Sequence, residues 1–287
     1  MGFLSKREVL AEAQRPHLDL SGARLEHSLG RLASACEDQG GLERFVEALK
    51  LKSALFQQAL GEDPASLEAS TFKQLCAFMS TVRRRVGPWL EEPSFNEVRG
   101  ALVELLAARQ DTATTDARIA AFCGAFADGA KQRWVRDLAA EVLHNTDPER
   151  FPLMNRWVWD AGTNTGVIRE IWHGQDVDHM RIDVPDRYDT FLVLREELSQ
   201  YLAKQGFFRD VTWYVDLLVA QVYGEYISEQ GGSYLRTDFA AEEDPILHTR
   251  RLLGLDGVQA GSGRTRLKTI DGTAYVLVDD ADAPPSA

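Results

Sequence analysis

The sequence predicts a mainly α-helical protein with a small β element. Two observations favour helices: apolar residues recur at three- and four-residue spacing along most of the chain, and capping patterns precede several of these runs. A third observation limits the β content, because runs typical of strands occur in only two places. We therefore expect a multi-helix globular core, with a strand near 166–172 and a C-terminal hairpin at 266–279.

The first half of the helical core is predicted from apolar spacing and capping. Residues 42–60 repeat apolar side chains at helical spacing, and GEDPAS then marks a turn. Thr71 with Gln74 makes a capping box before a helix that Gly87-Pro88 ends. Ser94 with Glu97 makes a second box before VRGALVELLAARQ, and two further helical patterns follow, DARIAAFCGAF and KQRWVRDLAAEVLHN.

The second half of the chain alternates loops with helices. The loop DAGTNTG leads into VIREIW, the strand candidate, and helices are predicted over 186–206 and 210–232. Beyond them lie a short helix, a linker and a hairpin whose Asp-Gly turn is a strong hairpin signal. We accordingly divide the chain into N-terminal helices (1–62), a helical core domain (63–232) and a tail (233–287).

The composition favours a cytoplasmic protein. A formal net charge of −12 over 287 residues disfavours attraction of nucleic acid to the whole surface, but it leaves room for a local basic patch. No apolar run approaches the roughly 20 residues that cross a bilayer, and the N-terminus lacks a signal-peptide pattern. The three cysteines form no CxxC pair. We expect no membrane partner, no structural zinc and no cofactor.

Histidine and aspartate are densest in IWHGQDVDHMRID, residues 171–183. The spacing of His173, Asp176, Asp178 and His179 resembles part of the HxHxDH signature of binuclear metallohydrolases. Gly174 and Asp176, however, stand where that signature needs histidine, and aspartate also favours turns. We interpret the segment as a polar loop and keep a metal site as the alternative.

Basic residues gather at two places in the sequence. Arg83, Arg84 and Arg85 end a predicted helix, where cations suit the helix dipole, and Lys131 and Arg133 begin another. A solvated helix end is the simpler interpretation. Contact with nucleic-acid phosphates is the other, and it gains support if the two groups lie close together.

Two segments carry residue types that are enriched at protein interfaces. FPLMNRWVWD contains Arg156, Trp157 and Trp159, and two tryptophans at this spacing cannot both face one core from one side of a helix. Packing in the core is the alternative, since tryptophan is usually buried. ILHTRRLL is a detached amphipathic segment of the kind that docks into a partner groove. Its candidate contact residues are Leu247, Leu252 and Leu253.

The motifs DARIAAF, HNTDPERFPLMN and YDTFLVLREELSQYL resemble helix-hairpin-helix-like segments of bacterial restriction, phage-defence and mobile-element proteins. The resemblance covers about residues 68–222, and its motifs are short. It implies a helical fold and a DNA-related context, without catalysis. ADGAKQRW departs from the glycine-rich hairpin of such segments, and the Lys and Asp that a base-excision glycosylase needs are absent.

No catalytic set can be assembled from spacing, since the GxSxG and GxxxxGK patterns are absent. We therefore expect no catalytic residues. The function that we predict is a non-catalytic helical interaction or adaptor subunit of a bacterial multi-protein system, with a protein partner, in a defence or mobile-element setting. The alternatives are a DNA-binding module that uses the basic helix end, and a metal-dependent hydrolase centred on residues 173–183.

Overall fold

The computed structural model describes most of the chain. The described residues are 15–37, 40–126, 132–174, 176–232, 246–256, 265–268 and 274–277. They are mainly helical and contain ten α-helices, which confirms the predicted fold class at this level. Among the described helices, none is long and apolar enough to cross a membrane.

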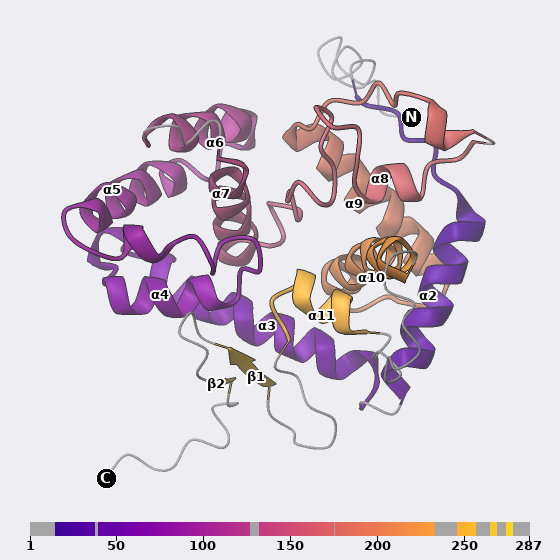
Figure 1. Cartoon of the computed structure of the whole chain (residues 1–287), viewed down its shortest axis with the longest axis horizontal. Coiled ribbons are helices and arrows are strands. Elements are labelled where there is room, and N and C mark those ends of the chain that lie inside the picture. Colours follow the sequence, from indigo (N-terminus) through magenta and orange to yellow (C-terminus); the bar gives the residue numbers. More distant parts are fainter. Residues whose placement is uncertain are drawn as a thin grey trace, which may run out of the picture.

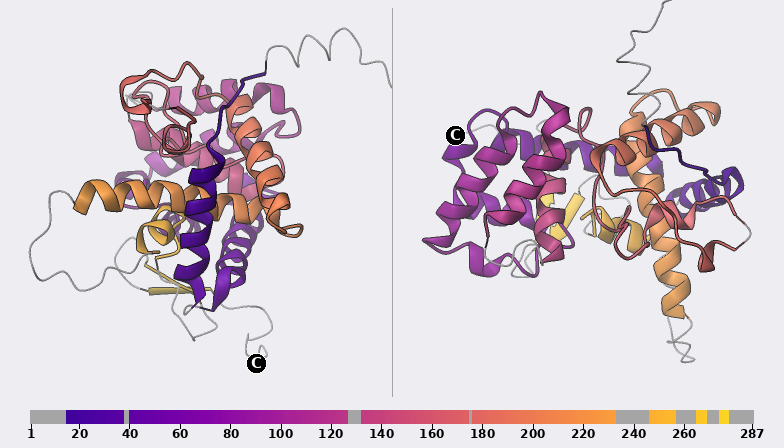
Figure 2. Two further views of the ribbon diagram at one scale, coloured as in Figure 1. Left: turned by 90° about the vertical axis from the view of Figure 1, so that its right-hand side faces the viewer. Right: turned by 90° about the horizontal axis from the view of Figure 1, so that it is seen from above.

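Two groups of helices lie side by side along the long helix α3 (Figures 1 and 2). The first group consists of α4 (Ala69–Ala77), α5 (Ser94–Leu106), α6 (Thr115–Gly124) and α7 (Arg133–Thr146). The second consists of α2 (Gly22–Glu37), α8 (Val167–Glu170), α9 (Tyr188–Lys204) and α10 (Val211–Gly232). Helix α3 (Gly41–Leu60) contacts α7 of the first group and α10 of the second, and the short α11 (Leu247–Leu252) packs on α10.

Helix α7 is buried around most of its circumference, because it packs against α3, α5 and α6. A helix in this position carries polar side chains into the core. The carboxylate of Glu141 accepts hydrogen bonds from Lys52 Nζ (3.1 Å), Asn145 Nδ2 (3.0 Å) and Asn155 Nδ2 (3.1 Å). A buried charge needs such partners, so this network fixes α3 and the loop after α7 against α7.

The two predicted capping boxes are wrong. Helix α4 begins before Thr71, α5 begins at Ser94 itself, and neither N-cap residue makes a side-chain capping bond. Helix α4 also ends at Ala77, so Arg83–Arg85 lies in a series of turns and not at a helix end. The turns bury Phe78 and the apolar residues after it as a longer helix would, and apolar spacing does not distinguish the two.

The strand predicted near 166–172 is also wrong, because Val167–Glu170 forms the short helix α8. Gly166 enters it with φ of +123°, and a Cβ at this position would lie 2.7 Å from the carbonyl oxygen of Val158. The β-branched residues Val167 and Ile168 are fully buried in this helical turn. A short apolar run fits a buried helix as well as a strand, and here tertiary packing decides.

Two short strands, β1 (Thr265–Lys268) and β2 (Ala274–Leu277), pair antiparallel. The residues that join them, 269–273, lie outside the described part of the chain. The small β element that we expected, with a strand near 166–172 and the complete 266–279 hairpin, is therefore not shown.

The segment around α11 docks on its own chain. Ile246, Thr249 and Leu253 are buried, and Thr249 Oγ1 donates to Gln221 Oε1 of α10 at 2.7 Å. Gly254, with φ of +74°, lies so close to Phe78 that a Cβ would sit 1.8 Å from the Phe78 carbonyl oxygen. Of the three leucines that we expected to contact a partner, Leu253 is thus packed against its own chain, whereas Leu247 and Leu252 are half-buried.

Candidate functional site

A pocket with a cavity volume of about 420 Å³ lies between the turn after α4, the start of α7 and the loop before α8. Residues of three separate segments bring their charged side chains to it. These are Arg84, Arg85, Arg133, Asp137, Arg156 and Asp160. We call this site the arginine pocket. Four arginines face two aspartates there, so the formal charge is positive in a protein whose net charge is −12.

Asp160 holds two of these arginines in place. Its Oδ2 accepts hydrogen bonds from Arg133 Nη2 (3.0 Å) and Arg156 Nε (3.0 Å), and its Oδ1 accepts from the amides of Gly162 (3.1 Å) and Thr163 (3.2 Å). Burial acts to raise the pKa of Asp160, but the hydrogen bond and charge of Arg156 outweigh it, so the pKa lies below the usual value. Asp160 is therefore an ionised carboxylate that orients two guanidinium groups.

Asp137 forms part of the pocket wall on the α7 side. Its side chain is almost fully buried, and its Oδ1 accepts a hydrogen bond from the Arg156 amide at 2.9 Å. Burial raises the pKa of Asp137, and this amide opposes only part of the effect. The pocket thus combines two carboxylates whose pKa values are displaced in opposite directions by their surroundings.

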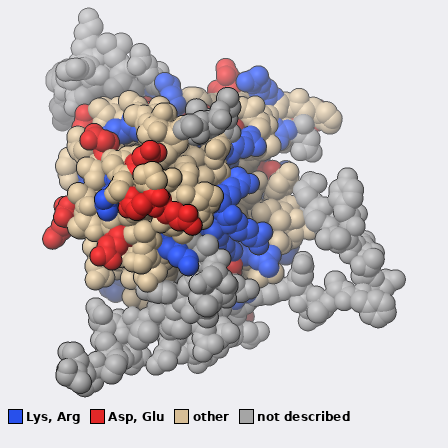
Figure 3. All heavy atoms as spheres, turned by 60° about the vertical axis from the view of Figure 1, so that its left-hand side comes forward, with Lys and Arg blue, Asp and Glu red and all other residues tan. Residues whose placement is uncertain are grey.

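Arg84 and Arg85 supply the unpaired charge of the site. Both are exposed, and neither guanidinium makes a hydrogen bond or ion pair with another described residue. Arg133 is also accessible, since 56% of its side chain is exposed beside Asp160. On the face of the molecule drawn in Figure 3, lysine and arginine atoms gather in a run, and acidic atoms gather beside them. Basic and acidic side chains are therefore segregated on this face.

Arg83, the third arginine of the predicted basic trio, is not available to the pocket. Arg83 Nη1 and Nη2 each donate to Asp256, at 2.7 Å, and both side chains are mostly buried. This ion pair fastens the turn after α4 to the segment around α11. Lys131 lies outside the described residues.

Both tryptophans predicted as partner contacts are buried, so core packing is the correct interpretation. Trp159 is fully buried and its Nε1 donates to the Val184 carbonyl at 2.9 Å. Trp157 is 7% exposed, lines the arginine pocket and lies with its ring centre 5.9 Å from that of Tyr223. Arg156, predicted as a third partner contact, belongs to the pocket instead.

The histidines and aspartates of residues 173–179 do not converge. His179 Nδ1 lies 2.6 Å from Asp176 Oδ1, but the two side chains are 81% and 75% exposed. His173 points to a different carboxylate, that of Asp19, at 3.7 Å. Across the described part of the chain, no group of three His, Cys, Asp or Glu residues is placed to hold a metal ion. The side chain of Asp178 is outside the described set.

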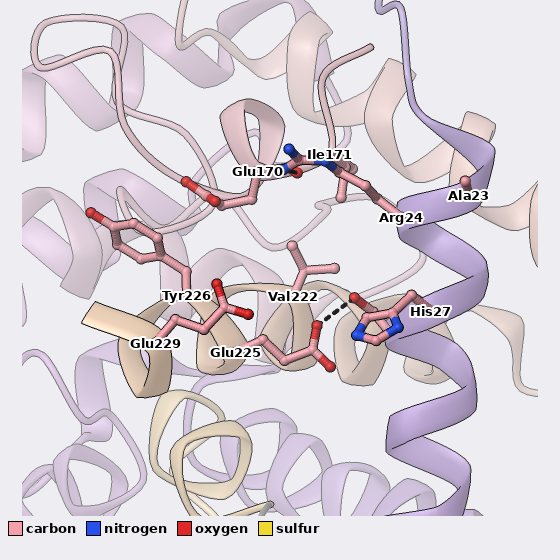
Figure 4. Close-up of a pocket in the computed structure, with 10 residues that line it drawn as sticks. Ala23, Arg24, His27, Glu170, Ile171, Val222, Glu225, Tyr226 and Glu229 are labelled. Carbon is pink, nitrogen blue, oxygen red and sulfur yellow. Dashed lines mark hydrogen bonds between the residues drawn. The ribbon is translucent and has the colours of Figure 1, made fainter. Parts of the chain in front are cut away.

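A second pocket, of about 390 Å³, lies between α2, α8 and α10 (Figure 4). Glu225 and Glu229 extend into it from α10, and Glu170 extends from α8. Glu225 is already bound, because it accepts from Ser28 Oγ at 2.7 Å and lies 3.5 Å from Arg31 Nε. These contacts make the acidic pocket a junction between α2 and α10.

Sequence reasoning found Arg84, Arg85, Arg133 and Arg156 but missed both aspartates of the arginine pocket. One signal for Asp160 was present: it stands four residues after Arg156 and begins the loop DAGTNTG, where aspartate accepts from following amides. For Asp137 and for Tyr223, nothing in the local sequence indicates the site.

The chain matches no family model, and comparison with curated proteins and with solved structures gave no match. The resemblance to segments of restriction, phage-defence and mobile-element proteins stays a prediction. The function must therefore be inferred from the chemistry of the arginine pocket itself.

Proposed function

We propose that the protein binds nucleic acid and contacts its phosphate groups through the arginine pocket. The proposal rests on one observation, the convergence of arginines from separate segments on one cavity. Arg84 and Arg85 come from the turn after α4, and Arg133 comes from the start of α7, yet all three line one cavity together with Arg156. Guanidinium groups present forked donors that match phosphate oxygens, so this grouping suits phosphate recognition.

The charge distribution supports binding at one place on the surface. With a net charge of −12, most of the molecule repels a polyanion, whereas the arginine pocket carries a formal excess of two positive charges. We expect contact with only a few phosphates. The affinity should then fall with salt, with a shallower slope than in proteins that neutralise many phosphates.

Three of the residues that favoured an adaptor subunit are buried, whereas Leu247 and Leu252 are half-buried. Trp157, Trp159 and Leu253 are buried, and the amphipathic segment that includes Leu253 packs on α10. These residues cannot bind a partner without leaving the core. Among the three functions predicted from the sequence, the nucleic-acid-binding module is therefore the one that the geometry favours.

The proposal is tested by fluorescence anisotropy with single-stranded and duplex DNA and RNA, at salt concentrations from about 50 to 200 mM. We expect salt-dependent binding that Arg84→Glu/Arg85→Glu weakens by about tenfold or more, since two phosphate contacts become repulsive. The matched control is Lys204→Glu/Arg209→Glu, which makes the same change of charge at two exposed positions, the last residue of α9 and the loop before α10.

Two results would contradict the proposal. One is the absence of binding to every nucleic acid in the series. The other is an equal loss of affinity in the arginine-pocket variant and the control variant, because that would mean that overall charge governs binding.

A further inference from the structure

Resting on the proposed function, we propose that the arginine pocket takes the end of a nucleic-acid strand, bound as a terminal phosphomonoester, rather than an internal phosphodiester. Three features of the pocket lead to this inference: its concave form, its charge and its surroundings.

The form of the site suits one compact group. Phosphate contacts along an extended strand need a surface or groove, whereas here the arginines surround a cavity of about 420 Å³. This volume lies within the roughly 300–1,000 Å³ of sites that bind small ligands. The turn after α4, the start of α7 and the loop before α8 all contribute to its lining, so donors from three segments can reach one phosphate group.

The charge of the site suits a monoester. Arg84, Arg85, Arg133 and Arg156 face Asp137 and Asp160, which leaves an excess of two positive charges. A terminal phosphate carries about −1.5 to −2 near neutral pH and has three oxygens to accept hydrogen bonds. An internal phosphodiester carries a single negative charge and has fewer free oxygens. The dianion therefore matches the pocket more closely.

The donors are arranged in two sets that a terminal phosphate can bridge. Arg133 and Arg156 are oriented by Asp160, at 3.0 Å each, and so lose little freedom when a ligand binds. Arg84 and Arg85 are unpaired among the described residues and provide the remaining donors. A phosphomonoester has enough oxygens to accept from both sets at once.

The surroundings disfavour a strand that continues past the pocket. The chain as a whole carries 44 Asp and Glu against 32 Lys and Arg. An extended strand would place further phosphates along a molecule of net negative charge, and like-charge contacts weaken binding. A strand end presents only its terminal group to the pocket and its remainder to solvent.

The inference is tested with one oligonucleotide sequence in four forms: with a 5′-phosphate, with a 3′-phosphate, with hydroxyl groups at both ends, and circularised. Affinities are compared by competition against a labelled strand. We expect one phosphorylated end to bind about tenfold more tightly than the hydroxyl form, and the circle to bind most weakly. In Arg84→Gln/Arg85→Gln, this preference for the phosphorylated end should disappear.

Each outcome separates this inference from the proposed function. If all four forms bind equally, and binding still depends on Arg84 and Arg85, the inference is overturned while nucleic-acid binding stands. If no form binds, both fail. A phosphoserine peptide serves as a further arm, and tighter binding of that peptide than of any phosphorylated strand would also overturn the inference. Thermal unfolding of the glutamine variant, whose altered residues are exposed, checks that it folds.

Discussion

In the sequence, the turn at Arg83–Arg85 and the loop at His173–His179 are comparable candidates for a functional site. The structure distinguishes them. Each concentrates residues with functional chemistry in a short stretch. The loop pairs its side chains locally, with His179 against Asp176, and leaves them in solvent. The turn brings Arg84 and Arg85 to residues of α7 and of the loop before α8. A high local density of reactive residue types is therefore weaker evidence for a site than side chains that converge from distant segments.

A physical reason for the difference is what lies behind each segment. The turn after α4 is held by the Arg83–Asp256 ion pair and by Gly254 packed on the Phe78 carbonyl. The loop is held mainly by Arg169, whose Nη2 donates to the Val177 carbonyl at 2.6 Å. The side chains of its histidines reach only exposed carboxylates, those of Asp19 and Asp176. The turn is therefore fixed by buried contacts of the fold, whereas the loop side chains can be substituted with little loss of stability.

The largest effect should come from the core that carries the arginine pocket. Glu141→Ala leaves the buried Lys52 without its carboxylate, and loss of one partner of a buried pair costs about 3–5 kcal/mol of unfolding free energy. The unfolding free energies of Glu141→Ala and Asp176→Ala, measured by chemical denaturation, compare the core with the loop directly. A loss below about 1 kcal/mol in Glu141→Ala would show that this network does not stabilise the pocket region.

The support behind the turn should have the next largest effect. Asp256→Ala removes both hydrogen bonds from the mostly buried Arg83, and we expect a loss of about 1–3 kcal/mol together with weaker nucleic-acid binding. Asp176→Ala removes an exposed pair in the loop and is the matched control. Equal changes in the two variants, measured by denaturation and anisotropy, would remove the distinction between turn and loop.

The pocket carboxylate Asp160 should give a pH signature. Its pKa in the folded protein lies below the usual 3.8, so its stabilising contribution is present above that value and is lost as the pH falls through the folded pKa. We expect Asp160→Asn to flatten the dependence of the melting temperature on pH in this acid range. A variant with the wild-type slope would mean that the arginines do not depend on Asp160.

A buried histidine offers a contrast with the exposed histidines of the loop. Burial acts to lower the pKa of His144, but the Asp216 carboxylate, 3.0 Å from Nε2, outweighs it and raises the pKa. The stabilising contribution of the pair is complete below the ordinary value of 6.5 and is lost as the pH rises through the folded pKa. His144→Gln should therefore lower the melting temperature more at a pH below 6.5 than at alkaline pH. The reverse order would contradict this assignment.

The smallest effect should come from the loop itself. His173→Ala and His179→Ala remove highly exposed side chains, so we expect changes within about 0.5 kcal/mol and no change in nucleic-acid affinity. Elemental analysis of the purified protein completes the test. About one zinc, iron or manganese per chain, lost in either variant, would restore the metal-dependent hydrolase that the sequence offered as an alternative.

Helices with sustained apolar spacing were predicted well, whereas features set by tertiary contacts were not. The pattern at 42–60 corresponds closely to α3, Gly41–Leu60. The strand near 166–172 failed because Gly166 admits a tight turn that buries Val167 in a helix. The same limit applies to the site. Single arginines are visible in the sequence, but the partnership of Arg133 with Asp160 depends on how α7 packs against a distant loop.

The most direct measurement is an NMR titration that follows the indole N–H signals of the six tryptophans. Trp134 and Trp157 line the arginine pocket, and Trp172 adjoins the loop at 173–179. On addition of the phosphorylated strand, we expect shifts of the Trp134 and Trp157 signals in wild-type protein and none in Arg84→Glu/Arg85→Glu. A shift of Trp172 with Trp134 and Trp157 unchanged would contradict binding at the arginine pocket and would place it at the loop.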